Sequence, residues 1–247
     1  MLEVRNLSKR FGALAATQSV GFTLAAGARH ALIGPNGAGK TTLVNLLTGQ
    51  LKPDAGSIAL AGTDLLPLKP HLRARAGLAR TYQINSLFLD FTPLQSVALA
   101  IAQRDGHATR LWRFSSLGPR IGEEAAQLLD SVGLGSALHT NTRLLPYGQQ
   151  RLLEVALALA GKPKVLLLDE PAAGVSKEAS HRLFDVLDKL PADLAILLIE
   201  HDMHLVFRFA KSISVLVGGA VLTEGAPAQI AADPRVRQVY LGSRHAA

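Results

Sequence analysis

Residues 34–41 constrain the fold of this chain more than any other segment, because they follow an apolar run and precede a helical pattern. Glycines at these spacings let successive backbone N–H groups converge on phosphate oxygens at the start of a helix, where the helix dipole favours an anion. A strand before the loop and a helix after it are the context that this pattern requires. The phosphate-binding residues that we expect are Gly34, Asn36, Gly37, Ala38, Gly39, Lys40, Thr41 and Thr42.

Three side chains in this loop have distinct expected roles. We expect the ammonium group of Lys40 to neutralise the β- and γ-phosphates of a nucleotide, and the hydroxyl of Thr41 to bind Mg²⁺. Thr42 is expected to donate to a phosphate oxygen from the next position. The alternative, a glycine-rich turn with an incidental lysine, does not account for the strand and the helix on either side.

Composition and charge narrow the class of protein. The chain has 247 residues, 48% hydrophobic and 18% charged, which is typical of a globular domain with a sizeable core. It has no cysteine, which excludes disulfides and thiolate metal sites. A formal charge of +7 favours polyanions, nucleotides or an anionic membrane surface. The apolar runs are far shorter than the roughly 20 residues that span a bilayer, and residues 1–10 do not read as a secretory signal, so we expect a cytosolic protein.

The spacing of apolar residues predicts an α/β fold. Alternating or continuous apolar runs predict strands over 2–7, 20–24, 28–33, 56–62, 77–83, 165–168 and 194–199. Helical spacing predicts helices over 40–51, 93–102, 149–160 and 177–190. Because the two kinds of element alternate, a parallel sheet with flanking helices is the economical arrangement.

The same patterns of strands and helices also predict the domain organisation. We expect one nucleotide-binding core over residues 1–86 and 162–247, with a helical sub-domain over 87–161. Within it, segment 104–120 carries four arginines around Trp112 and Phe114. This segment is either a basic and aromatic binding patch or a solvated helical insertion, and we favour the insertion because its composition is common on protein surfaces.

Two adjacent carboxylates follow a predicted buried strand. Asp169 and Glu170 stand where residues 165–168 emerge at the carboxyl edge of the sheet, the edge at which ligands bind in such folds. We expect Asp169 to bind Mg²⁺ and Glu170, which points elsewhere, to polarise the attacking water as a general base. A strand-end turn with two incidental acids is the alternative, and the phosphate loop argues against it because both elements serve one magnesium nucleotide.

Three further motifs complete an ordered set with these two. Residues 145–150 read Leu-Pro-Tyr-Gly-Gln-Gln, residues 81–83 read Thr-Tyr-Gln, and residues 200–202 read Glu-His-Asp. The five motifs, taken in their order along the chain, resemble those of the ATP-binding cassette (ABC) family. The resemblance implies an α/β P-loop NTPase core with an antiparallel β edge sheet and an inserted α-helical sub-domain.

The resemblance also implies roles for individual residues. Gln83 would sense Mg²⁺ and water, and His201 would hold the γ-phosphate and Glu170. Phe11 would stack on adenine, although a place in the hydrophobic core is the alternative for this residue. Residues 145–150 resemble the signature loop of the family, and its residues Tyr147, Gly148 and Gln149 would contact a nucleotide bound to a second subunit.

Details of several motifs are similar to the G-type ATPase of branched-chain amino acid importers. The segments that carry this likeness are residues 79–83, 147–148, 169–174, 198–203 and 239–242. The resemblance implies ATP and Mg²⁺ as cofactors. The partners that it implies are a second ABC ATPase subunit, identical or companion, membrane permease subunits and, indirectly, an extracytoplasmic substrate-binding protein. The chain would then be peripheral, at the cytoplasmic face of the cell membrane.

A non-transport ABC ATPase that acts on nucleic acid or ribosomes is the alternative function, and the positive charge allows it. Such proteins typically carry coiled coils, cysteine zinc modules or fused cassettes, whereas this sequence has no sustained heptad, no cysteine and one phosphate loop. We therefore expect no nucleic-acid partner. A switch GTPase fits less well still, because no Asn-Lys-x-Asp sequence is present.

Two residues depart from the wider ABC pattern. Pro146 stands where most signatures have Ser, so the hydroxyl that would donate to the partner's γ-phosphate is absent and backbone N–H groups near Gly148 remain. Ser176 stands where Asp is usual, and we expect it to cap a helix that starts at Lys177.

Overall fold

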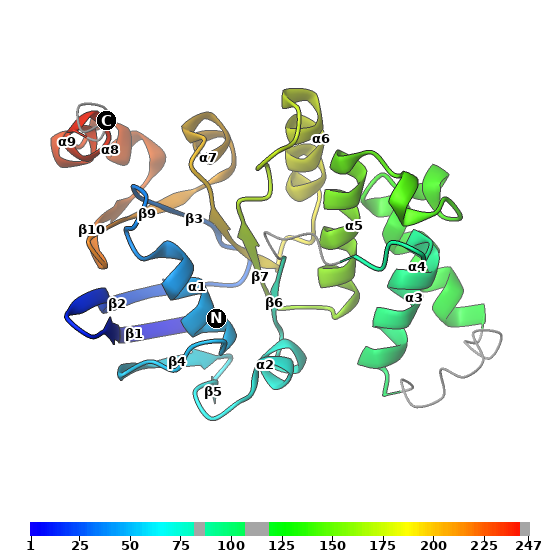
Figure 1. The fold of residues 1–247 in the computed structure, drawn as a ribbon, viewed down its shortest axis with the longest axis horizontal. Coiled ribbons are helices and arrows are strands. Elements are labelled where there is room, and N and C mark those ends of the chain that lie inside the picture. Colours follow the sequence, from blue (N-terminus) through cyan, green and yellow to red (C-terminus); the bar gives the residue numbers. More distant parts are fainter. Residues whose placement is uncertain (82–86, 107–118, 243–247) are drawn as a thin grey trace. The chain divides into compact units, whose positions relative to one another are not determined.

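The computed structural model describes residues 1–81, 87–106 and 119–242. The chain divides into two compact units, and Figure 1 labels most of their helices and strands. The first unit comprises Met1–Leu78, Lys164–Glu170 and Pro191–Ala247, and the second comprises Ala79–Pro163 and Pro171–Leu190. The predicted site residue Gln83 lies outside the described residues.

The first unit contains the antiparallel sheet that the ABC resemblance implied. Its strands are, in spatial order, β2 (Leu14–Leu24), β1 (Leu2–Phe11), β4 (Ala55–Leu60) and β5 (Thr63–Asp64). Leu2 pairs with Leu24 on one side and with Leu60 on the other, and all three side chains are buried. One face of this sheet is therefore part of the hydrophobic core, as alternation along β1 predicted.

The second sheet carries the predicted site. Its spatial order is β10 (Ala220–Gly225), β9 (Ser212–Val217), β3 (Arg29–Ile33), β8 (Ala195–Ile199) and β7 (Val165–Asp169), followed by β6 (Leu78–Arg80). The strands β9, β3, β8 and β7 are parallel, whereas β10 is antiparallel to β9. All residues of β7 and β8 are buried, which is typical of strands covered on both faces. Because β3, β7 and β8 are parallel, the segments that follow them emerge at one edge.

Hydrophobic clusters lie on both faces of this parallel sheet. Leu32 of β3 belongs to a cluster with the apolar side chains of α1 (Lys40–Thr48) and of the antiparallel sheet. Ala31 and Ile33 belong to the opposite cluster, as the alternation of side chains along a strand requires. This second cluster includes residues of α7 (Met203–Phe209), α8 (Pro227–Ala232) and α9 (Pro234–Gly242).

Helix α1 ends at Thr48, so the prediction that it continues to Leu51 was wrong. Gly49 has φ = 79° and terminates the helix in a left-handed conformation. The buried guanidinium of Arg73, in α2 (Pro70–Ala76), donates to two carbonyl oxygens at the end of α1, both at 2.7 Å. A further helical turn would need those carbonyl groups, so Arg73 and the glycine together end the helix.

Other predicted boundaries differ from the structure by a few residues. The strand predicted over 56–62 ends at Leu60, because Ala61 and Gly62 have positive φ and turn the chain into β5. The strand predicted over 77–83 spans only β6 in the described residues. The elements that follow residue 202, as well as α2 and α4 (Pro119–Ser131), were not predicted.

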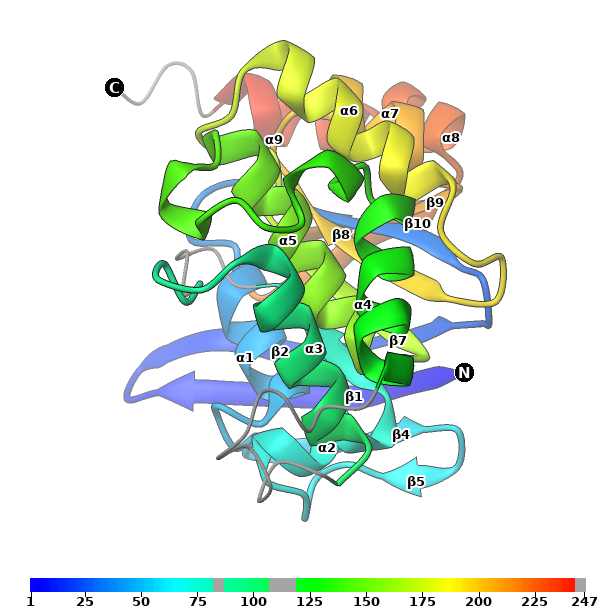
Figure 2. The ribbon, with the colours of Figure 1, turned by 90° about the vertical axis from the view of Figure 1, so that its right-hand side faces the viewer.

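The second unit is mostly helical, as Figure 2 shows. Its helices are α3 (Pro93–Arg104), α4, α5 (Tyr147–Ala160) and α6 (Lys177–Asp188), with 3₁₀ turns at Gly135–Ala137 and Thr142–Leu144. Helix α3 packs against α4 and α5, and α5 packs against α6. Thr92 and Gln95 form a capping box at the start of α3. The hydroxyl of Ser176 accepts the N–H of Ala179, which confirms the predicted cap of α6.

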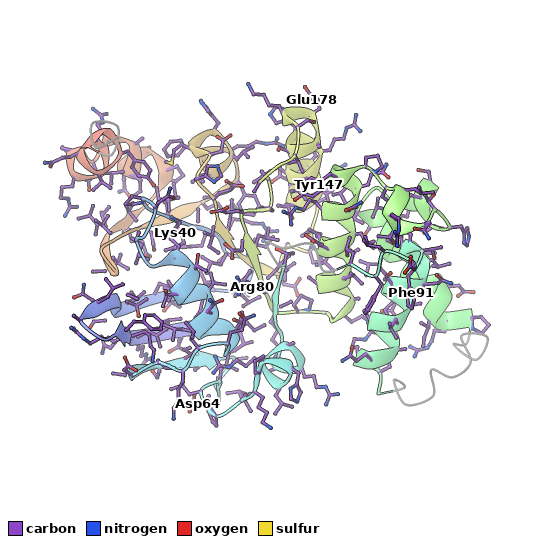
Figure 3. The ribbon with its side chains drawn as sticks, viewed as in Figure 1. Lys40, Asp64, Arg80, Phe91, Tyr147 and Glu178 are labelled. Atoms are coloured by element: carbon purple, nitrogen blue, oxygen red, sulfur yellow. The ribbon has the colours of Figure 1, made fainter. Side chains whose placement is uncertain are left out.

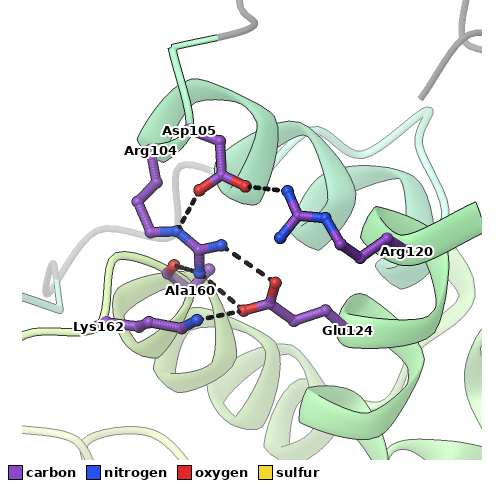
Figure 4. A network of polar contacts seen from close by, with 6 residues as sticks. All are labelled: Arg104, Asp105, Arg120, Glu124, Ala160 and Lys162. Atoms are coloured by element: carbon purple, nitrogen blue, oxygen red, sulfur yellow. Dashed lines mark hydrogen bonds and ion pairs between the residues drawn. The ribbon is translucent and has the colours of Figure 1, made fainter. Parts of the chain in front are cut away.

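A network of charged groups joins α3, α4 and the end of α5 (Figure 4). Arg104 donates to both carboxylate oxygens of Glu124 at 2.8 and 3.1 Å, to Asp105 at 2.8 Å and to the carbonyl oxygen of Ala160 at 3.0 Å. Lys162 lies 2.9 Å from Glu124. Hydrogen bonds from Arg104 and Lys162 favour the charged carboxylate, which lowers the pKa of Glu124 to about 2.

This network corrects part of the interpretation of segment 104–120. The Arg104 side chain is only 17% exposed and is held by two carboxylates, so it is a structural tie rather than part of a solvated insertion. Arg120 is exposed and pairs with Asp105 at 2.9 Å. Residues 107–118, with Trp112 and Phe114, lie outside the described residues.

Candidate functional site

The loop between β3 and α1 runs close to neighbouring backbone at two of its glycines. A Cβ atom at Gly39 would overlap the carbonyl oxygen of Ala16, and one at Gly34 would overlap that of Leu216. Gly37 and Gly39 have φ of 77° and 102°, a region that side-chain-bearing residues rarely adopt. The glycine pattern therefore follows from close backbone approach and from left-handed conformations, both of which a phosphate cradle needs.

The remaining residues of this loop differ in exposure. Gly34 and Ala38 are buried, and Gly39, Lys40 and Thr42 are partly buried, whereas Asn36, Gly37 and Thr41 are exposed. The N–H of Gly219, in the turn between β9 and β10, donates to the carbonyl oxygen of Ala38 at 3.0 Å. The loop is thus held by the turn between β9 and β10 through Ala38, while Asn36 and Gly37 are exposed to solvent.

Lys40 is the first residue of α1, and Figure 3 labels it at the start of that helix. Its ammonium group donates to the carbonyl oxygens of Gly34 at 2.6 Å and Pro35 at 3.0 Å. Burial lowers the pKa of Lys40, and the negative charges of Glu170 and Asp169 oppose that shift. The lysine and the two carboxylates therefore share one electrostatic environment at the carboxyl edge of the sheet.

The two carboxylates differ in environment although they are adjacent. Asp169 ends β7 and is 3% exposed. Glu170 is partly buried and has φ = 48°, a left-handed conformation that ends the alternation of the strand. The alternation of side chains along β7 therefore stops at Asp169, and the two carboxylates differ in burial.

His201 follows β8 at the same edge. Its side chain is 66% exposed, and its Nδ1 lies 3.5 Å from Oε2 of Glu200. The buried carboxylate of Glu200 accepts the backbone N–H of His201 at 2.8 Å and that of Asp202 at 3.3 Å. Glu200 therefore shapes the turn that leaves the imidazole in solvent.

Phe11 ends β1 and is 48% exposed, so it does not belong to the hydrophobic core. The ammonium group of Lys9 lies 5.7 Å from the centroid of its ring. The partner strand of the same hairpin contributes Ala16, whose carbonyl oxygen lies against Gly39 of the loop. An exposed aromatic ring thus stands on the hairpin that contacts the candidate phosphate loop.

The predicted signature residues Tyr147, Gly148 and Gln149 form the first turn of α5, in the second unit. Pro146 is the N-cap residue and supplies no side-chain hydrogen bond, while the N–H of Gln149 donates to its carbonyl oxygen at 2.8 Å. The guanidinium of Arg151 lies over the ring of Tyr147, 5.1 Å from its centroid, and donates to the phenolic oxygen at 2.7 Å.

Comparison with known proteins decides the family. The family model described as ABC transporter matches residues 17–173, which is more than half of the chain. This chain belongs to the ABC transporter family. As an ABC transporter ATP-binding protein, it is an ATPase. A second model, described as branched-chain amino acid ATP-binding cassette transporter, matches residues 220–246.

Full-length relatives of this ABC ATPase are branched-chain amino acid transport proteins by name. The chain is 37% identical to the high-affinity branched-chain amino acid transport ATP-binding protein BraF of Pseudomonas aeruginosa, over 98% of each chain. It is 38% identical to the corresponding protein LivG of Escherichia coli, again over 98% of each. A solved structure described as the ADP conformation of MJ1267, an ATP-binding cassette of an ABC transporter, is 28% identical, covers 98% of both chains and has a TM-score of 0.86.

Sequence reasoning missed two buried groups of this ABC ATPase. One is Glu200, and the signal that marks it is an acid placed directly after the buried strand β8. The other is the pair of Arg151 and Glu154, both buried and joined at 2.8 Å three residues apart in α5. The helical spacing of Tyr147, Arg151 and Glu154 places them on one face, a pattern that the sequence does contain.

The residues present fit a nucleotide with one bound magnesium ion. The loop offers a glycine cradle, a lysine and a threonine hydroxyl, and Asp169 adds one carboxylate. Within residues 1–81, 87–106 and 119–242, no cluster of three or more His, Asp or Glu side chains forms a metal site. The hydroxyl of Thr41 and the carboxylate of Asp169 are oxygen donors of the kind that Mg²⁺ binds together with phosphate oxygens and water. In the same part of the chain, no helix is both long and apolar enough to cross a membrane.

Proposed function

We propose that this ABC ATPase powers the uptake of branched-chain or related amino acids through partner membrane permeases. The observation that carries the proposal is the convergence of Lys40, Asp169 and Glu170 at the end of a glycine cradle. This site stands in a chain whose relatives of matching length are named for branched-chain amino acid transport. The names of these relatives favour import over action on nucleic acid or ribosomes.

The phosphate loop binds the nucleotide in this proposal. Backbone N–H groups of residues 37–42 hold the phosphate oxygens at the start of α1, where the helix dipole favours them. Lys40 leaves the two carbonyl oxygens that it now contacts and neutralises the β- and γ-phosphates. Phe11 stacks on the adenine ring.

Thr41, Asp169 and Gln83 hold Mg²⁺ when it is bound with the nucleotide, and the ion supplies positive charge against the phosphate oxygens. Glu170 accepts a proton from the attacking water, a role that suits a partly exposed carboxylate next to a lysine. His201 orients the γ-phosphate and Glu170. Its exposed imidazole, held on a turn by Glu200, is free to move toward a substrate.

A second ABC ATPase subunit completes the site in this proposal. The first turn of α5, with Tyr147, Gly148 and Gln149, contacts the nucleotide held by the partner subunit, and the partner's turn does the same in return. Pro146 provides no hydroxyl, so the contact depends on backbone donors and on the helix dipole. A dimer should therefore form with ATP rather than without it.

Membrane permease subunits are the remaining direct partners that we propose. The second unit exposes three large apolar side chains, Phe88 and Leu89 in the loop before α3 and Leu144 in the 3₁₀ turn Thr142–Leu144. The N–H of Arg143 donates to the carbonyl oxygen of Leu89 at 3.2 Å, which joins the loop to the 3₁₀ turn. Such a patch fits a protein partner better than water. The chain would then lie peripherally at the cytoplasmic face of the membrane, with an extracytoplasmic substrate-binding protein acting through the permeases.

Reconstitution tests this function. The chain, co-expressed with the permeases of its genomic neighbourhood and placed in proteoliposomes, should hydrolyse ATP faster when leucine and the binding protein are supplied outside. Lys40→Ala in the same complex should abolish both basal and stimulated hydrolysis. Co-purification with ribosomes or nucleic acid, and no association with permeases, would contradict the transport function.

A separate experiment tests the composite site. Sedimentation of Glu170→Gln with Mg-ATP should show a dimer that is absent without nucleotide, because binding remains while turnover is slowed. Full ATP turnover by the wild-type chain as a strict monomer would contradict a site shared between two subunits.

A further inference from the structure

Asp54 lies in the turn between α1 and β4, and its carboxylate reaches the end of β1. One carboxylate oxygen accepts the backbone N–H of Arg10 at 2.7 Å, and the other accepts a hydrogen bond from the ammonium group of Lys9 at 2.8 Å. The backbone N–H of Asp54 donates in turn to the carbonyl oxygen of Ser8 at 2.9 Å. The three consecutive residues of β1 that precede Phe11 are therefore tied to this one aspartate.

The contacts of Asp54 take over where the pairing of the strands stops. Within residues 1–81, the pairing of β1 with β4 ends at Ser8, three residues before Phe11. Asp54 stands directly before β4, and its carboxylate binds the N–H of Arg10, beyond the last residue paired with β4. On its other side, β1 pairs with β2 as far as Phe11. The end of β1 that carries the Phe11 ring is thus held on the β4 side through Asp54.

The ion pair also fixes the direction of the Lys9 side chain. This side chain is only 18% exposed although it carries a charge, and its ammonium group ends on Asp54. An ion pair this close to the surface contributes little to the free energy of unfolding. Its clearer effect is on conformation, because a lysine held at its ammonium group no longer samples the many rotamers of a free side chain.

The position of Lys9 matters because its ammonium group lies over the ring of Phe11, 5.7 Å from the ring centroid. A cation over an aromatic face is attracted to the ring, and it also occupies that face. Phe11 nevertheless remains exposed to solvent. An adenine ring that stacks on Phe11 therefore has the face opposite Lys9 to use.

We propose that Asp54 is a positioning residue of the adenine site, which holds the Lys9 ammonium on one face of the Phe11 ring and so presents the other face to the base. Asp54 then acts on the affinity for the base through Phe11, and it leaves the affinity for the phosphates unchanged. A ring that is not held must be ordered on binding, and that ordering weakens affinity. This inference rests on the proposed stacking of Phe11 on adenine.

Asp54→Ala removes both acceptor oxygens and keeps Phe11 and the phosphate loop. Calorimetric titration of the full chain with Mg-ADP should show a dissociation constant about two- to tenfold higher, the range expected for the loss of a hydrogen bond. Titration with inorganic pyrophosphate and Mg²⁺, a probe without a base, should give the wild-type dissociation constant. The KM for ATP should rise by a factor similar to that for Mg-ADP, while kcat at saturating ATP stays close to that of the wild type.

A double variant shows whether Asp54 acts through Phe11. In the Phe11→Ala background, Asp54→Ala should leave the affinity for Mg-ADP unchanged, because the ring that Asp54 positions is gone. If Asp54→Ala weakens the affinity as much in this background as in the wild type, Asp54 acts by another route and the inference is wrong.

Asp64→Ala is the matched control, because Asp64 is an exposed aspartate of β5, next to β4, whose carboxylate accepts the N–H of Leu66 at 2.9 Å. We expect it to leave the affinities for Mg-ADP and pyrophosphate unchanged. Asp54→Asn keeps the size of the side chain and removes its charge, so it should weaken Mg-ADP binding less than Asp54→Ala and serves if that variant does not fold. If the Asp54 variants weaken both probes equally or neither, Asp54 does not position the ring.

Phe11→Ala alone distinguishes a failure of the inference from a failure of the proposed function. If Phe11→Ala weakens Mg-ADP binding and Asp54→Ala does not, adenine stacks on Phe11 and only the role of Asp54 is overturned. If Phe11→Ala leaves Mg-ADP binding intact, the proposed adenine site is wrong and the inference falls with it.

Discussion

The backbone N–H of Glu170 donates to the carbonyl oxygen of Ile199 at 2.8 Å, which joins the ends of the parallel strands β7 and β8. This bond accompanies the left-handed φ of 48° at Glu170, a conformation that costs about 1 kcal/mol or more in a residue other than glycine. At Glu170 the chain leaves the extended conformation of the strand that carries Asp169, so the alternation along that strand does not set the direction of the Glu170 carboxylate.

We expect Glu170→Gln to keep ATP binding and to lose most turnover, by about 10²- to 10⁴-fold, because the water loses its general base. Hydrolysis at saturating Mg-ATP, measured together with nucleotide affinity, checks this. Glu178→Gln, an exposed change in the first turn of α6, is the control and should retain wild-type rates. Wild-type turnover in Glu170→Gln would exclude this residue as the base.

Phe11→Ala should weaken ATP binding by roughly 1 to 3 kcal/mol, the scale of stacking between a base and an aromatic ring. Saturated turnover should remain largely intact. Leu14 pairs with Phe11 across the hairpin and is 68% exposed, so Leu14→Ala removes a comparable apolar side chain at the same place. Calorimetry should show weaker binding in Phe11→Ala alone. Equal ATP affinities of Phe11→Ala and Leu14→Ala would show that Phe11 does not stack on adenine.

Gly39→Ala should abolish high-affinity nucleotide binding, because the new Cβ meets the carbonyl oxygen of Ala16 at a φ of 102°. Gly62→Ala is the control, since Gly62 has φ = 84° but no atom within 4 Å of the added Cβ. That change should cost about 1 to 2 kcal/mol of unfolding free energy and leave affinity unchanged. Titration with Mg-ADP and chemical denaturation of both variants measure the two effects. Normal affinity in Gly39→Ala would show that the loop tolerates a side chain there.

The charged network of the second unit should contribute stability that depends on pH. The folded pKa of Glu124 is lowered to about 2 from an ordinary value of 4.5. Its contribution to the free energy of unfolding is therefore complete above pH 4.5 and is lost as the pH falls towards 2. Urea denaturation should show that Glu124→Gln is less stable than the wild type at pH 7 and that the difference shrinks in acid. The exposed Glu123→Gln should show no such difference, and equal stability of Glu124→Gln at pH 7 would contradict this role.

Buried His30 should make the first unit sensitive to mild acid. Its two ring nitrogens lie 2.7 and 2.8 Å from the hydroxyls of Ser212 and Ser214. Burial lowers its pKa below the ordinary 6.5, and the charge of Glu224 only partly opposes that shift. On acidification His30 therefore binds a proton at a higher pH in the unfolded chain than in the folded one. The free energy of unfolding then falls as the pH drops below 6.5.

Replacing His30 checks this assignment. Denaturation at pH 7 and pH 5.5 should show a smaller loss of stability on acidification in His30→Gln than in the wild type. The exposed His71→Gln should keep the wild-type dependence. If His30→Gln loses as much stability between pH 7 and pH 5.5 as the wild type, another group causes the acid sensitivity.

The sequence by itself determined the phosphate loop, the two carboxylates and most strands and helices of the core. These features are local, because a glycine spacing or an apolar run depends on backbone conformations and side-chain periods within a few residues. The cap at Ser176 was predictable for the same reason, since its hydroxyl reaches an N–H three residues away.

The tertiary structure alone decided how these pieces are held. Arg73 donates to carbonyl groups at the end of α1, and Ile199 accepts from Glu170, and the two residues of each pair lie many residues apart in the chain. No local pattern marks such pairs, because a buried hydrogen bond between distant segments depends on which strands are neighbours and which cluster each side chain enters. The order of the parallel sheet, with β3 between β8 and β9, creates those neighbours. That order follows from burying both faces of the sheet at once, a condition on the whole chain rather than on any segment of it.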